Sequence, residues 1–143
     1  MSIRSITLAA AFLFASAAAA SSATVTVQVN DIESGEGQIY VGLCDRGFEE
    51  ALCIDGKFQA ARPGTMTFTF ENVPPGTYAI AAYHDVNGNG RMDTGTFSLP
   101  KEPYGFSNDV GRIAPPNFLA ATIPVSSPGA TITVRMARMI FGG

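Results

Sequence analysis

Alternation of apolar and polar residues with a period of two is the feature that most restricts the fold of this chain. In TVTVQVN, residues 24–30, the three valines share one face of an extended strand and the polar side chains share the other. The same pattern recurs in QIYVGL (38–43), TMTFTFE (65–71), TYAIAAYH (77–84), ATIPV (121–125) and TITVRM (131–136). This period is typical of strands that bury one face.

Turn signals separate these segments, as expected if neighbouring strands run antiparallel. Glycine or proline falls in each of SGEG (34–37), RPG (62–64), PPG (74–76) and SPG (127–129). Several short strands with turns at this spacing favour two packed sheets. The sequence therefore predicts an all-β fold, a single antiparallel β-sandwich of six to seven strands with an Ig-like or transthyretin-like arrangement.

The first twenty residues have the pattern of a secretory signal peptide. A basic start at Arg4 is followed by an apolar run at 6–14 and the small-residue stretch ASAAAASSA at 15–23. We expect cleavage after Ala20, or as late as Ala23, which makes residues 21–143 the sandwich domain. No later segment approaches the roughly 18 apolar residues of a membrane span. We therefore expect a periplasmic or secreted protein with no transmembrane span in the mature chain.

Charge and cysteine content narrow the functional classes to which the protein could belong. The net charge is −3, with no basic stripe, which argues against nucleic acid as a partner. Cys44 and Cys53 are the only cysteines, and in an exported chain an even pair predicts a disulfide. A redox-active pair usually has two intervening residues, whereas eight separate these cysteines.

The segment HDVNGNGRMD, residues 84–93, carries the strongest chemical signal in the sequence. Oxygen-bearing side chains stand at alternate positions before a glycine, which is the opening of a calcium-binding loop. The predicted ligands are the side chains of Asp85, Asn87, Asn89 and Asp93 and the main-chain carbonyl of Arg91. The twelfth position holds Thr96 instead of the usual glutamate, so Glu102 is the candidate to fold back and complete the shell. We expect weak calcium affinity, of the order of 0.1–1 mM.

The alternative interpretation of this segment is a polar hairpin that binds no metal. Asn-Gly is a strong two-residue turn signal, and it occurs here twice, at 87–88 and 89–90. One turn needs the signal once. A plain turn also has no use for the two carboxylates of Asp85 and Asp93, which repel each other when no cation lies between them.

The chain resembles the bacterial exported family catalogued as domain of unknown function 2141. The resemblance rests on three segments: a Pro-Gly-x-Tyr strand entry, an HD-x-N-x-NG-x-x-D loop and a Pro-x-E-x-x-GFS segment. The matching residues are Pro75, Gly76, Tyr78, His84, Asp85, Asn87, Asn89, Gly90, Asp93, Pro100, Glu102, Gly105, Phe106 and Ser107. The strand entry is also similar to that of transthyretin-like and collagen-adhesin-repeat sandwiches. The resemblance implies the fold and export, and it supplies no activity.

Residues 97–118 form a long segment with four prolines, several aromatic residues and no strand pattern. Long loops in compact domains are usually functional or disordered, and this composition favours order. One interpretation is a ligand surface made by Tyr104 and Phe106. The other, which we favour, is that the aromatic side chains close one end of the sandwich.

We therefore predict a non-catalytic binding or structural module of the cell envelope, with an envelope protein or a glycan as its partner. Only one histidine is present and no G-x-S-x-G motif, so an acyl-transfer triad is not expected. One alternative is a glycan-directed periplasmic hydrolase that uses Asp93 and Glu102 as its carboxylate pair. The other alternative is a partner-docking domain whose hairpin binds no metal.

Overall fold

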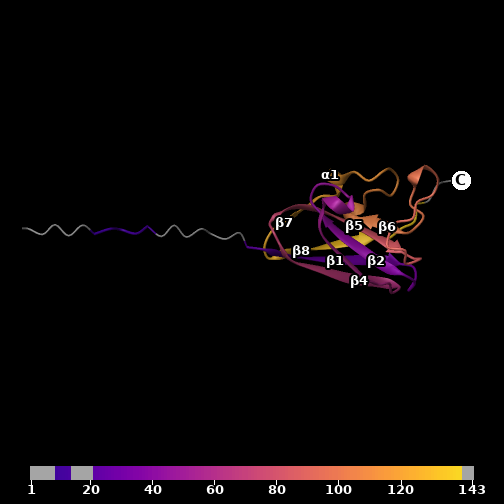
Figure 1. The fold of residues 1–143 in the computed structure, drawn as a ribbon, viewed down its shortest axis with the longest axis horizontal. Helices are drawn as coiled ribbons and strands as arrows, with labels where there is room; N and C mark the ends of the chain where they lie inside the picture. The colour runs from indigo at the N-terminus through magenta and orange to yellow at the C-terminus, as the bar shows by residue number, and fades with distance from the viewer. Residues whose placement is uncertain (1–8, 14–20, 140–143) are drawn as a thin grey trace, which may run out of the picture.

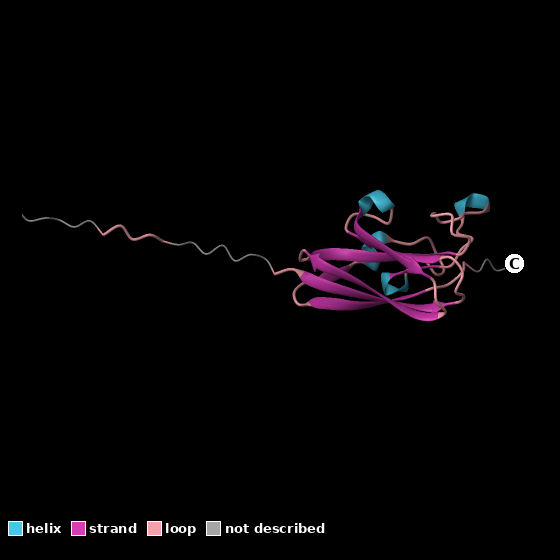
Figure 2. Ribbon diagram, turned by 60° about the horizontal axis from the view of Figure 1, so that its bottom comes forward, coloured by secondary structure: helices cyan, strands magenta, loops and turns pink. Residues whose placement is uncertain are grey.

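Two layers of β-strands, packed face to face, make up the described part of the chain (Figures 1 and 2). The computed structural model describes residues 9–13 and 21–139. The predicted signal peptide, residues 1–20, lies outside the described residues apart from 9–13. The strands are β1 (Ala23–Ile32), β2 (Gln38–Cys44), β3 (Cys53–Ala60), β4 (Gly64–Val73), β5 (Gly76–Asp85), β6 (Tyr104–Phe106), β7 (Ile123–Val125) and β8 (Gly129–Arg135).

Helical structure in the described residues is limited to short turns between these strands. The α-helix α1 covers Phe118–Ala121, and the 3-10 turns are η1 (Glu50–Leu52), η2 (Thr96–Ser98) and η3 (Ser107–Asp109). None of the described helices has the length and apolar character needed to cross a membrane. The predicted all-β sandwich is therefore confirmed.

The strand order explains how the two layers are built. One sheet has the order β4-β1-β8, and the other has the order β3-β2-β5-β6, with β7 also paired to β5. All pairs are antiparallel except β1 with β8, which run parallel. The parallel pair departs from the wholly antiparallel sandwich that we predicted. It arises because the chain leaves β7 in the second sheet and crosses over to place β8 beside β1.

The crossing into β8 brings two main chains very close together. The Thr24 N–H donates to the Pro128 carbonyl over 3.0 Å. A Cβ at Gly129 would lie 2.0 Å from the Thr24 carbonyl oxygen, so no side chain fits there. Gly129 also has a φ of 153°, which disfavours other residues. The glycine of the SPG segment is therefore required by the contact between β1 and β8.

The core lies between the sheets and is filled by the apolar faces that the alternation predicted. In β1, Val25, Val27 and Val29 are buried, and Val27 pairs with Phe68 of β4 and Ile132 of β8. The second sheet contributes Ile39, Val41, Leu43, Ile80 and Ala82. Burial of such side chains contributes about 1.5–3 kcal/mol each, which makes this interface the main source of stability.

Two strands of the second sheet were not predicted from the sequence. Strand β3 has no buried residue, so its apolar and polar residues do not alternate with burial. Strand β6 has only three residues and lies inside the segment 97–118, where we saw no strand pattern. Both strands flank the central pair of β2 and β5, whose alternation the sequence shows.

Candidate functional site

The calcium-type segment lies where β5 ends and connects this strand to its antiparallel neighbour β6. Asp85 is the last residue of β5 and is 1% exposed. Its two carboxylate oxygens accept the N–H groups of Asn89 over 3.1 Å and Gly90 over 2.7 Å. These bonds need sharp turns, and Gly88 and Gly90 supply them with φ values of 66° and 79°. Asp85 thus fixes residues 86–90 against the end of the strand.

Glu102 closes the same loop from its other end. Its side chain is 6% exposed, and Oε1 accepts the Val86 N–H over 2.9 Å. Oε2 accepts the Asp93 N–H over 3.0 Å. The Lys101 N–H also donates to the Asp93 carbonyl over 2.8 Å. Glu102 therefore lies against the loop and joins residues 86 and 93.

Asp93 lies where the polar side chains of the loop meet. The side-chain amides of Asn87 and Asn89 both donate to its carboxylate, the latter over 2.8 Å. These hydrogen bonds, from Asn89 first, hold the pKa of Asp93 below its usual range, and Arg91 adds to the effect. The structure thus brings together the side chains of Asn87, Asn89 and Asp93.

The remaining predicted ligand is Arg91. Its N–H donates to the Asn89 side-chain oxygen over 3.1 Å. Its Nε lies 3.8 Å from the Asp93 carboxylate, on an exposed side chain.

The Asn87 side-chain oxygen likewise accepts the Asn89 N–H over 3.3 Å. Both asparagine oxygens are therefore bonded to main-chain N–H groups of the loop.

Within the described residues, no group of three or more histidine, cysteine, aspartate or glutamate side chains is arranged to hold a metal ion. A calcium site here would depend on the asparagine oxygens and the Arg91 carbonyl as well as on carboxylates. In the same part of the chain, none of the ion pairs within 4 Å involves Asp85 or Glu102. Main-chain N–H groups are thus the hydrogen-bond donors to these two buried carboxylates.

His84 precedes the loop and ties it to the turn between β1 and β2. The imidazole is buried, and Nε2 lies 2.6 Å from the Glu36 carbonyl oxygen. The His84 N–H donates to the Pro103 carbonyl over 2.9 Å. Gly37 lies so close that a Cβ there would be 1.8 Å from the Asp85 carbonyl oxygen. The histidine thus supports the base of the loop from the adjacent turn.

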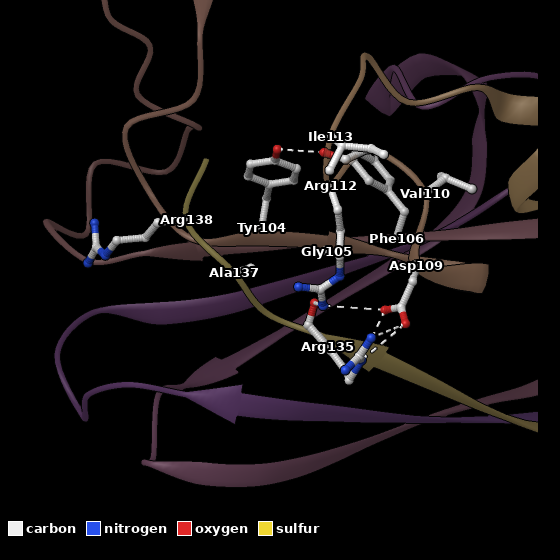
Figure 3. A pocket seen from close by; sticks show the side chains of 11 residues that line it. Tyr104, Gly105, Phe106, Asp109, Val110, Arg112, Ile113, Arg135, Ala137 and Arg138 are labelled. Carbon is white, nitrogen blue, oxygen red and sulfur yellow. Dashed lines mark hydrogen bonds and ion pairs between the residues drawn. The ribbon is translucent and has the colours of Figure 1, made fainter. Parts of the chain in front are cut away.

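Tyr104 and Phe106, the predicted ligand surface, lie beside a pocket of about 290 Å³. Tyr104 is buried, and its hydroxyl donates to the Gly111 carbonyl over 2.8 Å (Figure 3). Phe106 is partly buried and packs against Phe48, with ring centroids 4.4 Å apart. Phe48 also meets Phe118 edge to face. These aromatic contacts join β6 to the segments on either side of it.

Charged residues that sequence reasoning missed line the same pocket. Arg135 of β8 donates to both carboxylate oxygens of Asp109, and Arg112 donates to one of them over 3.3 Å (Figure 3). The hydrogen bonds from Arg135 lower the pKa of Asp109, and the charge of Arg112 acts in the same direction. Asp109 and Arg135 are far apart in the sequence, so no local motif could have indicated the pair.

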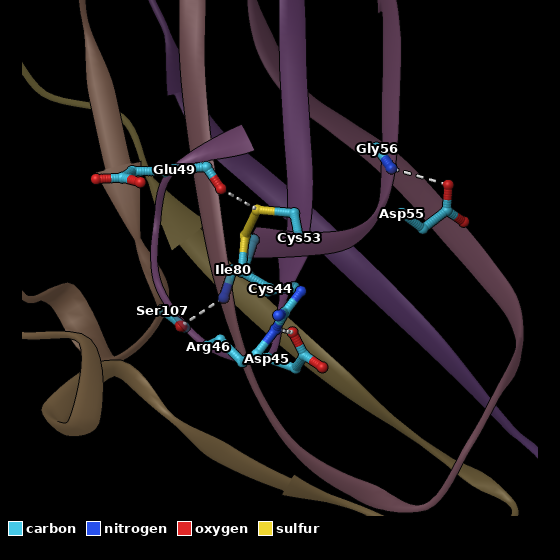
Figure 4. The surroundings of a disulfide bond; sticks show 9 residues. All are labelled: Cys44, Asp45, Arg46, Glu49, Cys53, Asp55, Gly56, Ile80 and Ser107. Atoms are coloured by element: carbon cyan, nitrogen blue, oxygen red, sulfur yellow. Dashed lines mark hydrogen bonds and ion pairs between the residues drawn. A yellow bond between two sulfur atoms is a disulfide. The ribbon is translucent and has the colours of Figure 1, made fainter. Parts of the chain in front are cut away.

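The predicted disulfide between Cys44 and Cys53 is confirmed (Figure 4). The two cysteines are paired across β2 and β3, at the end of one strand and the start of the next. No cysteine of the described chain is free. A Cβ at Gly42 would lie 3.3 Å from the Cys53 sulfur, so a larger residue there would press against the disulfide.

One family model matches this chain. The family model described as "Uncharacterized protein conserved in bacteria (DUF2141)" matches residues 27–133. No curated protein and no solved structure matches the chain. The matched residues include most of β1, all of β2 to β7, the loop, Glu102 and most of β8.

The bonds of Glu102 predict that its removal loosens the loop. Glu102→Ala leaves the Val86 and Asp93 N–H groups without an acceptor, and we expect a loss of about 2–3 kcal/mol in the free energy of unfolding. Denaturant unfolding measures the loss, and amide exchange at residues 86 and 93 should quicken. Glu71→Ala, on the exposed face of β4, is the matched control. Unchanged exchange at both amides would contradict this role.

Proposed function

The chain belongs to DUF2141, a family of uncharacterised proteins conserved in bacteria, and from its loop we propose that it is an exported, non-catalytic module that binds calcium. The observation that carries the proposal is the pair of buried carboxylates, Asp85 and Glu102, which bracket an oxygen-rich loop. In the described chain, neither has a basic partner within ion-pair distance. A cation at this position would balance their charge.

The chemistry of the loop fits calcium better than other biological cations. Calcium takes six to eight oxygen ligands from carboxylates, amides and carbonyls, in a flexible arrangement. The proposed ligands are those that the sequence predicts: side chains of Asp85, Asn87, Asn89 and Asp93, the carbonyl of Arg91, and Glu102 as the last member. Thiolate and imidazole ligands are absent from this set, which disfavours zinc.

Binding requires a local change in the loop. The amide nitrogens of Asn87 and Asn89 point toward Asp93, so both amides must turn to present their oxygens. Turning breaks the hydrogen bonds that those oxygens accept from the Asn89 and Arg91 N–H groups. This cost, and the lack of a glutamate at the twelfth position, agree with a dissociation constant of about 0.1–1 mM. Such affinity suits an extracytoplasmic protein, as the signal-peptide pattern indicates.

The proposed ion would also stiffen the segment that follows the loop. Glu102 and Lys101 bind residues 86 and 93 of the loop and belong to the segment 97–118. Calcium that fixes Asp93 and Glu102 would therefore order the chain leading into β6. We propose that this surface, beside the loop, contacts an envelope protein or a glycan.

The burial and hydrogen bonding of the candidate catalytic side chains favour a non-catalytic role over hydrolysis. The imidazole of His84 is buried against the Glu36 carbonyl, away from solvent. Glu102 is buried too, and both its oxygens accept main-chain N–H groups. A general acid must reach the scissile bond of its substrate, so Glu102 is poorly placed for glycoside hydrolysis.

Calcium should raise the thermal stability of the protein selectively. At about 100 times the dissociation constant, a ligand that binds only the folded state adds roughly 2.7 kcal/mol. We expect a rise of several degrees in Tm over EDTA, and little rise with equal magnesium. Asp93→Asn should remove most of this rise, whereas Asp45→Asn, at an exposed position remote from the loop in sequence, should keep it. Equal Tm values in EDTA and calcium would contradict the proposal.

Tyr83 offers an optical test of the same site, because it precedes the loop on β5. Burial first, then Tyr40, Asp85 and other nearby acidic groups including Glu102, raises the pKa of Tyr83 to about 12. The folded state therefore favours the neutral phenol, and stability is lost as the pH rises above about 10 through this value. Calcium should lower the pKa of Tyr83, because it offsets the charges of Asp85 and Glu102.

The measurement is a phenolate titration with and without calcium, with Tyr83→Phe identifying the signal. Tyr78 also has a raised pKa, caused mainly by burial and then by Asp45, so its titration is the internal control. If calcium leaves the titration curve of Tyr83 unchanged, the result would count against calcium binding beside Asp85.

A further inference from the structure

Strand β3 is the exposed edge of the larger sheet, and its outer side pairs with no described strand. Its eight residues are all exposed or half-buried. Two large apolar side chains stand on it, Ile54 at 45% exposure and Phe58 at 60%. A long, open edge of this kind is a template for pairing with another chain.

The sequence of β3 is self-complementary about its glycine. Reading outward from Gly56, the first neighbours are Asp55 and Lys57, of opposite charge. The next neighbours are Ile54 and Phe58, both apolar. In an antiparallel pair of identical strands centred on Gly56, Asp55 therefore meets Lys57 and Ile54 meets Phe58.

The backbone of β3 is oriented for such a pair. The Gly56 N–H donates to the side chain of its neighbour Asp55 over 2.8 Å. In an antiparallel ladder, main-chain groups of successive residues point alternately to the two sides of the strand. The main-chain N–H and carbonyl of Gly56 thus face the open edge, whereas the main-chain groups of Asp55 and Lys57 face β2.

We propose that two copies of this chain form a dimer through antiparallel pairing of β3 with β3, centred on Gly56. The Gly56 N–H would then donate to Gly56 of the partner subunit. This exchange frees the Asp55 carboxylate for Lys57 of the partner subunit. Ile54 would pack on Phe58 of the partner subunit, and the two-fold axis makes every contact twice.

Only this register matches the charges. Centring the pair on residue 55 brings two aspartates together, and centring it on residue 57 brings two lysines together. Like charges directly opposite each other are destabilising. A shift by one residue would also turn the side chains of one strand to the opposite face. The charges thus oppose the registers centred on residues 55 and 57 and favour the register centred on Gly56.

The outer face of the sheet would continue across the interface. Phe58 already stacks on Tyr40, with centroids 5.3 Å apart, and Tyr40 stacks on Tyr83 at 4.9 Å. These three residues lie in one row across β3, β2 and β5. Ile54 of the partner subunit would extend this row past Phe58 and cover its exposed side.

Sedimentation of the purified protein in EDTA tests the dimer independently of calcium binding. Because a pair of edge strands is a small interface, we expect the dimer fraction to rise over about 10–500 µM. A purely monomeric protein across this range would overturn the proposal. Arg62→Glu, which reverses an exposed charge just beyond the strand, should leave the dissociation constant unchanged.

Charge reversal provides the sharper test. Asp55→Lys and Lys57→Asp should each weaken the dimer at least tenfold, about 1.4 kcal/mol or more, because like charges then face each other. An equimolar mixture of the two variants should form a heterodimer, since both cross-strand pairs are again opposite in charge. The double variant Asp55→Lys/Lys57→Asp should regain self-association.

Mixing the two single variants also distinguishes a loss of strand pairing from a loss of folding. A variant that failed to fold could not recover by being mixed, and thermal melts of each variant check the fold directly. Failure of folded single variants to associate on mixing would overturn the register centred on Gly56.

Discussion

The carboxylate of Glu102 holds the two ends of the calcium-type loop together, and the geometry of the candidate site depends on it. It accepts N–H groups from Val86, just after β5, and from Asp93, at the end of the loop. Asp85 performs a similar task inside the loop through Asn89 and Gly90. Two buried carboxylates thus bind the main chain of one short segment. The same negative charge that orders the loop is what a cation would neutralise.

Strand β5 connects this loop to the rest of the molecule. It pairs with β2 over residues 79–85, with β6 over residues 81–83 and with β7 over residues 76–78. Its inner face contributes Ile80 and Ala82 to the core, and its outer face contributes Tyr83 to the aromatic row. The loop is therefore attached to the best-supported strand of the sheet. A change of charge at Asp85 therefore shifts the pKa of Tyr83, which lies two residues before it in the strand.

The sequence predicted those parts of the structure that depend on local pattern. Alternation located β1, β2, β4, β5, β7 and β8, and the oxygen spacing located the loop. It could not reveal the parallel pairing of β1 with β8, because alternation is identical for both strand directions. Strand β3 was missed because an edge strand exposed on both faces has no buried face to mark it. The pair of Asp109 and Arg135 joins residues distant in sequence, and the orientation of the Asn87 and Asn89 amides depends on hydrogen bonds that no spacing records.

The most direct measurement of the central claim is a calcium titration followed by amide NMR of the labelled protein. If the loop binds the ion, the N–H signals of Asn89 and Arg91 move because their asparagine acceptors turn away. The Gly90 signal moves with them, because its acceptor Asp85 becomes a ligand of the ion. The shifts should saturate as one site with a dissociation constant of about 0.1–1 mM. Signals from this loop that stay fixed while calcium reaches about 10 mM would contradict the account, and the loop would then be a hairpin held by its own carboxylates.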